Sequence, residues 1–90
     1  MDEIIAYLNS NKNYEKALLK VCQLLLDGKK PTIASIQIGV KVGYNRAGKL
    51  MDILQDLGVV SPFNIEHPVR TVNKEQLEKV KEYLESDMSV

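Results

Sequence analysis

The chain has 90 residues, with 12 basic and 12 acidic side chains that give a formal net charge of zero. A chain this short builds one small hydrophobic core, so we expect a single domain over residues 1–90. Its one cysteine, Cys22, excludes an internal disulfide, and no apolar run approaches the roughly 18 residues of a membrane span. With no secretion signal in the first residues, these features predict a cytoplasmic protein that does not enter a membrane.

The charged residues are unevenly distributed. Five cations and no acid lie between Gly28 and Met51, whereas acids gather near both ends. Charge acts over about 8 Å at physiological salt, so a cationic middle can attract phosphates locally although the whole chain is neutral. The five cations are Lys29, Lys30, Lys41, Arg46 and Lys49.

Two helices are predicted in the first third of the chain. Residues 1–10 carry apolar side chains at helical spacing and predict a short helix. Residues 13–27 repeat apolar side chains every three or four positions, which is typical of an amphipathic helix. Gly28 is suited to cap this helix in the left-handed conformation, and Pro31 follows where the helix cannot continue.

The next segment is predicted to form a brief strand and then a short helix. Thr32 and Ile33 are expected in the strand. Ser35 suits an N-cap, which places the helix from there to about Val40.

A third helix is predicted from about Tyr44 to Leu57, after a turn closed by Gly43. Tyr44 lies at the edge of its apolar stripe and is expected to pack there. The buried face carries Ala47, Leu50, Met51, Leu54 and Leu57, and the opposite face carries Asn45, Lys49, Asp52 and Asp56, with Arg46 on the flank.

A β-hairpin, the wing, is predicted to follow. Val59–Val60 and Val69–Val72 are β-branched runs separated by residues 61–68, which include two prolines. Phe63 in this loop is expected to pack under the hairpin. The alternatives are insertion into a DNA minor groove and packing against a second copy.

A last helix is predicted over residues 73–87, where Asn73 followed by Gln76 resembles a capping box. The apolar residues of this helix and of residues 1–10 form either a dimer surface or a cover for the small core, and both interpretations stay open. The residues concerned are Ile4, Ile5, Leu8, Leu77, Val80, Tyr83 and Leu84.

Short segments of the chain follow the pattern of a known family. They are Ala34-Ser35-Ile36, Val42-Gly43-Tyr44-Asn45-Arg46-Ala47, Leu57-Gly58-Val59-Val60 and Val69-Arg70-Thr71-Val72. Together they resemble the C-terminal gamma domain of FtsK- and SpoIIIE-type DNA translocases, a winged helix that recognises short oriented sequences in duplex DNA. The resemblance covers about residues 14–72.

The resemblance implies a recognition helix that begins at Asn45 and Arg46, with Lys49 one turn further, and it makes Arg70 the wing arginine. Gly48 stands where the family usually has alanine, which weakens the helix by roughly 1 kcal/mol. No motor sequence precedes the module, and the chain has no Gly-rich phosphate-binding loop with Lys-Ser or Lys-Thr. The resemblance therefore supports DNA binding and leaves translocation unsupported.

The predicted contacts suit the chemistry of DNA. Asparagine and arginine each make two hydrogen bonds to a base edge, so Asn45 and Arg46 are predicted to recognise adenine and guanine. The lysines suit phosphates, where charge matters more than geometry. The alternative is an ordinary solvated helix face. The predicted DNA-binding set is Lys29, Lys30, Ser35, Lys41, Tyr44, Asn45, Arg46, Lys49 and Arg70.

No catalytic, metal or cofactor site is predicted. Cys22 lies in an apolar run and is predicted to be a buried small hydrophobe rather than a nucleophile. His67 has no cysteine or second histidine near it, so it is predicted to cap the wing loop rather than to bind metal. No set of Ser, His and Asp indicates hydrolysis, and we do not expect an enzyme.

The sequence thus predicts a mainly α fold with a small β-hairpin, a winged helix-turn-helix with extra N-terminal and C-terminal helices. The predicted function is sequence-specific binding of double-stranded DNA by a homodimer. Such a protein serves as a centromere-binding adaptor in plasmid or phage DNA segregation, with a segregation or regulatory protein as partner, or as a transcriptional regulator. The alternative is a winged-helix protein–protein interaction module that does not bind DNA.

Overall fold

The computed structural model describes residues 12–66 and 70–88. A short 3-10 helix, η1 (Lys12–Tyr14), leads into α2 (Glu15–Leu26), and α3 (Ile33–Val40), α4 (Tyr44–Asp56) and α5 (Lys74–Met88) follow. No helix in these ranges is both long and apolar enough to cross a membrane. The predicted helix over residues 1–10 and the predicted role of His67 lie outside the described residues.

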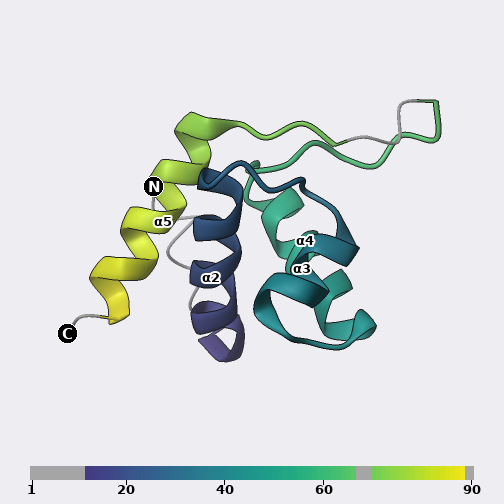
Figure 1. Cartoon of the computed structure of the whole chain (residues 1–90). Coiled ribbons are helices and arrows are strands. Elements are labelled where there is room, and N and C mark those ends of the chain that lie inside the picture. Colours follow the sequence, from purple (N-terminus) through teal and green to yellow (C-terminus); the bar gives the residue numbers. More distant parts are fainter. Residues whose placement is uncertain (1–11, 67–69, 89–90) are drawn as a thin grey trace.

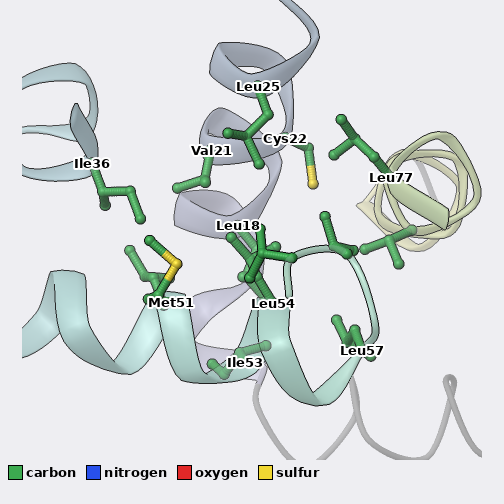
Figure 2. Packing of buried hydrophobic residues seen from close by; sticks show 14 of the residues in the cluster. Leu18, Val21, Cys22, Leu25, Ile36, Met51, Ile53, Leu54, Leu57 and Leu77 are labelled. Carbon is green, nitrogen blue, oxygen red and sulfur yellow. The ribbon is translucent and has the colours of Figure 1, made fainter. Parts of the chain in front are cut away.

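Helix α2 lies in the middle of the molecule, with α5 on one side and α3 and α4 on the other (Figure 1). The side chains of all four helices meet in one hydrophobic core, where α2 residues face Ile36 of α3, Met51 and Leu54 of α4 and Leu77 of α5 (Figure 2). Every apolar residue predicted to be buried on α4 is buried, and Ile53 joins them. The full cluster is Leu18, Val21, Cys22, Leu25, Ile36, Ala47, Leu50, Met51, Ile53, Leu54, Leu57, Val59, Val60, Leu77, Val80 and Leu84.

Glycine residues cap the C-terminal ends of α2 and α4. Gly28 has a φ of 89° and Gly58 a φ of 78°, in the region that glycine adopts without strain. The amide of Lys29 donates to the carbonyl of Leu24, and that of Val59 donates to the carbonyl of Leu54. These are the bonds of a Schellman motif, so the cap predicted at Gly28 is confirmed.

The start of α3 differs from the prediction. Thr32 and Ile33 do not form a strand, because Thr32 is the N-cap and Ile33 the first residue of the helix. The Thr32 hydroxyl accepts a hydrogen bond from the amide of Ser35 at 3.1 Å, so the N-cap predicted at Ser35 is wrong by three residues. Both residues carry a hydroxyl, and only the extended backbone of Thr32 (φ −122°, ψ 156°) fits the cap.

Among the described residues, the predicted hairpin is reduced to isolated β-bridges. Val60 and Val72 form an isolated antiparallel bridge, the Ser61 amide donates to the Thr71 carbonyl, and no regular strand extends from them in residues 12–66 and 70–88. The two arms project well beyond the helices (Figure 1). We call residues 61–71 the wing loop. Val59 and Val60 are buried in the core, whereas the described residues of the projecting arms have no sheet face to bury, so no regular strand forms there.

Helix α5 covers the core. Asn73 Oδ1 accepts from the amide of Gln76 at 3.1 Å, as predicted, but Gln76 Nε2 donates to the carbonyl of Leu57 at 2.8 Å. Gln76 therefore caps the end of α4 rather than completing a capping box. The prediction that this helix contributes to a dimer surface is wrong. Three of the four residues concerned, Leu77, Val80 and Leu84, are fully buried within the same chain.

Candidate nucleic-acid interface

Helices α3 and α4 form a helix-turn-helix. The turn is tight because Lys41 adopts a left-handed conformation (φ 60°) and Gly43 is the extended N-cap of α4. The amide of Ala47 donates to the carbonyl of Gly43 at 3.0 Å, which closes the first turn of α4. Ala47 and Ile36 are both buried in the core, so the orientation of α4 on the body is fixed by packing.

The first two turns of α4 present a polar face to solvent. Asn45, Arg46 and Lys49 are all exposed, as predicted. Tyr44 is also exposed, at 66% of its surface, so the prediction that it packs at the edge of the core is wrong. The tyrosine is the first residue of the helix and lies beyond the reach of the core.

The guanidinium of Arg46 is held against the body of the chain. Its Nη2 donates to the carbonyl oxygen of Asn13 at 3.2 Å, and its Cζ lies 5.0 Å from the centroid of the Tyr14 ring. Both partners are neutral, so they fix the position of the charge without cancelling it. The Arg46 guanidinium is thus directed toward η1, whereas Asn45, its neighbour in the sequence, is exposed at the start of α4.

The predicted phosphate-binding lysines are exposed at two places. Lys29 and Lys30 lie in the connection between α2 and α3, and Lys41 lies in the turn before α4. Ser35 is half-buried in the first turn of α3, where its hydroxyl accepts a hydrogen bond from Thr32 Oγ1 at 2.9 Å. The lysines are accessible to a ligand, whereas the Ser35 hydroxyl has a structural partner.

Arg70 is half-buried at the base of the wing loop. Its Nη1 donates to Gln55 Oε1 and to the carbonyl of Ser61, both at 2.9 Å, and its Cζ lies 5.8 Å from the centroid of the Phe63 ring. The guanidinium thus joins the wing loop to α4. Phe63 itself is 59% exposed, so the prediction that it packs under the hairpin is wrong.

The uneven charge along the sequence becomes an uneven charge in space. Helix α5 lies on the far side of α2 from α3 and α4 (Figure 1). Four of its acids are exposed there, away from the cations of the α3–α4 side. On α4 itself, Asp52 and Asp56 are exposed in the later turns, so the cationic face is confined to the start of the helix. The four α5 acids are Glu75, Glu78, Glu82 and Glu85.

Two cations on α2 were missed from the sequence. Lys16 and Lys20 are exposed on the polar face of the helix and line a groove of about 470 Å³ that Arg46 also lines. They lie outside the acid-free window of the sequence. Their i, i+4 spacing on the polar side of an amphipathic helix was the available signal.

Nothing in the described ranges, 12–66 and 70–88, forms a cluster of three or more side chains suited to hold a metal ion. Cys22 is fully buried, as predicted, and burial raises the pKa of its thiol to about 12. A thiol with so high a pKa carries almost no thiolate at neutral pH, so Cys22 is unsuited to act as a nucleophile.

These features define a helix-turn-helix module with a projecting wing loop and an exposed polar start to its second helix. The chain belongs to the FtsK gamma domain family, whose model matches residues 12–74. The match confirms the resemblance predicted from the sequence, and it includes η1 through α4 and the wing loop. It ends at the first residue of α5.

Several relatives are DNA translocases. The chain is 34% identical over 58 residues to DNA translocase FtsK 1 of Neisseria meningitidis, a match over 64% of this chain and 7% of that protein. It is 31% identical over 65 residues to DNA translocase FtsK of Clostridium acetobutylicum, a match over 67% of this chain and 8% of that protein. The chain therefore spans less than a tenth of the length of these relatives. No solved structure matches it significantly.

Proposed function

We propose that this protein recognises specific sequences in double-stranded DNA by placing the first two turns of α4 in the major groove. The observation that carries the proposal is the exposed polar start of α4, with Tyr44, Asn45 and Lys49 projecting from a helix whose other face is locked into the core. An α-helix fits the major groove, where each base pair presents a distinct pattern of donors and acceptors. Membership of the FtsK gamma domain family supports the same assignment.

The exposed residues fall into two groups, one suited to base edges and the other to phosphates. Asn45 is the candidate for base recognition, because a side-chain amide donates to and accepts from the adenine edge. Lys29, Lys30, Lys41 and Lys49 are the candidates for phosphate contact, which sets position and affinity without specifying sequence. The carboxylates of the later α4 turns repel phosphates, so the helix approaches DNA by its N-terminal end.

Salt dependence tests the electrostatic part of the proposal. With about four or five phosphates neutralised per subunit, the logarithm of affinity falls with the logarithm of salt concentration at a slope of about −4. Fluorescence anisotropy with a labelled random duplex measures this slope. Binding that does not respond to salt contradicts the proposal.

Two single variants test how sequence is recognised. Asn45→Ala is expected to weaken the preferred site by about 1–3 kcal/mol while leaving a scrambled duplex almost unaffected, so sequence preference falls. Lys30→Gln, the matched control, is expected to weaken both duplexes by the same factor. The preferred site comes from selection of bound fragments from genomic DNA. Equal losses on both duplexes for Asn45→Ala contradict its role in base recognition.

We further propose that such a module acts as a centromere-binding adaptor in plasmid or phage DNA segregation or as a transcriptional regulator. A homodimer suits either task, since two half-sites engaged together raise affinity. Sedimentation equilibrium tests the dimer, whose interface no longer includes the buried side chains of α5. A cluster of direct repeats among the selected fragments indicates segregation, and a lone palindrome in a promoter indicates regulation.

A protein-interaction module is the second candidate, favoured by the exposed acids of α5 and the zero net charge. The two candidates differ at low salt. A DNA-binding module retains nonspecific affinity for random duplex, whereas an interaction module with this charge gives no shift in a gel. The gel shift at low salt therefore separates them directly.

A further inference from the structure

A cation-lined groove lies beside the start of α4. The N-terminal half of α2 forms one wall, and the end of α3 with the following turn forms the other, where Val40 and Val42 contribute apolar surface. Lys16 and Lys20 project from α2, and Arg46 projects from α4. Three cations from two helices thus line one open groove of about 470 Å³, together with Glu15, an acidic residue that is 9% exposed.

The three cations differ in how firmly they are placed. Lys16 and Lys20 are exposed and one helical turn apart, so their ammonium groups can move to follow a ligand. The Arg46 guanidinium is fixed by the Asn13 carbonyl at 3.2 Å and by the Tyr14 ring at 5.0 Å. Because a guanidinium has five N–H donors and Asn13 takes one, donors remain for a further acceptor.

This arrangement suits phosphate better than a base edge. Bidentate recognition of guanine engages two N–H groups of the guanidinium, whereas Nη2 of Arg46 already donates to the Asn13 carbonyl of the same chain. Phosphate oxygens accept from cations over a wide range of directions, and lysines bind them as point charges. The groove adjoins the polar face of α4, where the DNA backbone passes if α4 occupies the major groove.

We propose that this groove binds a phosphodiester group of the DNA strand that flanks the bases contacted by α4, an inference that rests on the proposed function. Lys16 and Lys20 supply mobile positive charge, and Arg46 supplies fixed donors. Arg46 is then a phosphate contact and not the guanine-recognising residue that the sequence predicts. The DNA-binding surface extends from the acid-free segment onto α2.

The salt dependence of binding tests the groove. The double variant Lys16→Gln/Lys20→Gln is compared with wild type on the selected site and on a scrambled duplex. Each neutralised phosphate contributes about 0.9 to the slope and the groove binds one phosphodiester group, so the double variant is expected to flatten the slope by about 1 unit while the preference between duplexes stays the same. The matched control is Lys74→Gln/Lys79→Gln, two exposed lysines on α5, which changes net charge equally and is expected to leave the slope unaltered.

Arg46→Gln provides the second measurement. A phosphate contact predicts similar weakening of the selected and scrambled duplexes, whereas a guanine contact predicts lost preference at one G·C pair. An unchanged slope for the α2 variant, equal flattening by both double variants, or relaxed preference for Arg46→Gln overturns the inference. If wild type itself does not bind duplex DNA, the proposed function fails. If wild type binds and the α2 variant behaves like it, only the groove assignment fails.

Discussion

The Arg70 side chain donates to the Gln55 side chain at 2.9 Å, and this bond ties the wing loop to the last turns of α4. The same Nη1 atom donates to the carbonyl of Ser61, on the opposite arm of the loop. One guanidinium therefore holds three segments together, next to the β-bridge between Val60 and Val72 that joins the two arms. The angle at which the wing loop leaves the body depends on it.

We expect Arg70→Met to destabilise the fold by about 1–3 kcal/mol, since a hydrogen bond from a charged donor is lost and Gln55 is left half-buried without that donor. Urea denaturation of Arg70→Met, Gln55→Met and the double variant forms a thermodynamic cycle. The two residues are in contact, so their coupling energy is expected to exceed about 0.5 kcal/mol. Strictly additive effects would show that the two side chains do not interact in solution.

Gly48 offers a stabilising substitution. It lies inside α4, and a Cβ added there meets no other atom within 4 Å. Since glycine costs about 1 kcal/mol relative to alanine in a helix interior, Gly48→Ala is expected to stabilise the protein by about 0.5–1 kcal/mol. The midpoint of urea denaturation should rise with an unchanged slope.

Gly39 in α3 is the matched control for this substitution. An added Cβ there collides with the Leu24 side chain of α2, whose Cδ1, Cδ2 and Cγ atoms all crowd the position. Moving this side chain offsets the gain in helix propensity, so Gly39→Ala is expected to give a smaller gain than Gly48→Ala or a loss. Equal stabilisation by the two variants would contradict the close packing of α3 on α2.

The helices were predictable because their signals are local. The apolar periodicity of α2 and α4 and the caps at Gly28 and Gly58 each occupy a few consecutive residues, and the structure matches them closely. The N-cap of α3 was misplaced because Thr32 and Ser35 carry the same donor and acceptor three residues apart. The choice between them depends on backbone geometry that the sequence pattern does not specify.

The candidate interface was less predictable because side-chain direction depends on distant residues. Exposure of Asn45 and Lys49 follows from the period of the helix. The position of the Arg46 guanidinium depends on Asn13, which lies 33 residues earlier in the chain. In the same way, the role of Arg70 depends on Gln55, and no periodicity connects those two positions.

Because the Cys22 thiol is buried, the free energy of unfolding is expected to fall at alkaline pH. Burial raises its pKa from 9.0 to about 12, so the folded state holds this proton more tightly than the unfolded state. The stability contributed by the protonated thiol is fully present below pH 9 and is lost as pH rises toward 12. By a pH of about 10.5 the expected loss is about 2 kcal/mol.

The control for this prediction is Cys22→Ala, which has no thiol to titrate. Urea denaturation at about pH 8 and about pH 10.5 gives the loss of stability for each protein, and the difference between the two losses isolates the contribution of Cys22. Equal losses would mean that the thiol is accessible in the folded state. A thiol reagent at neutral pH should likewise react with the unfolded protein and leave the native protein unmodified.

Substitution of Tyr44 tests whether its side chain packs against the protein or binds DNA. Its side chain is 66% exposed at the first position of α4, so Tyr44→Ala is expected to change the free energy of unfolding by less than about 0.5 kcal/mol. A tyrosine hydroxyl beside the DNA backbone donates to a phosphate oxygen, and its loss is expected to weaken duplex binding by about fivefold. Tyr44→Phe removes the hydroxyl alone and should reproduce most of that loss. A lower urea midpoint for Tyr44→Ala, with DNA affinity unaltered in the folded protein, would instead assign the ring to packing.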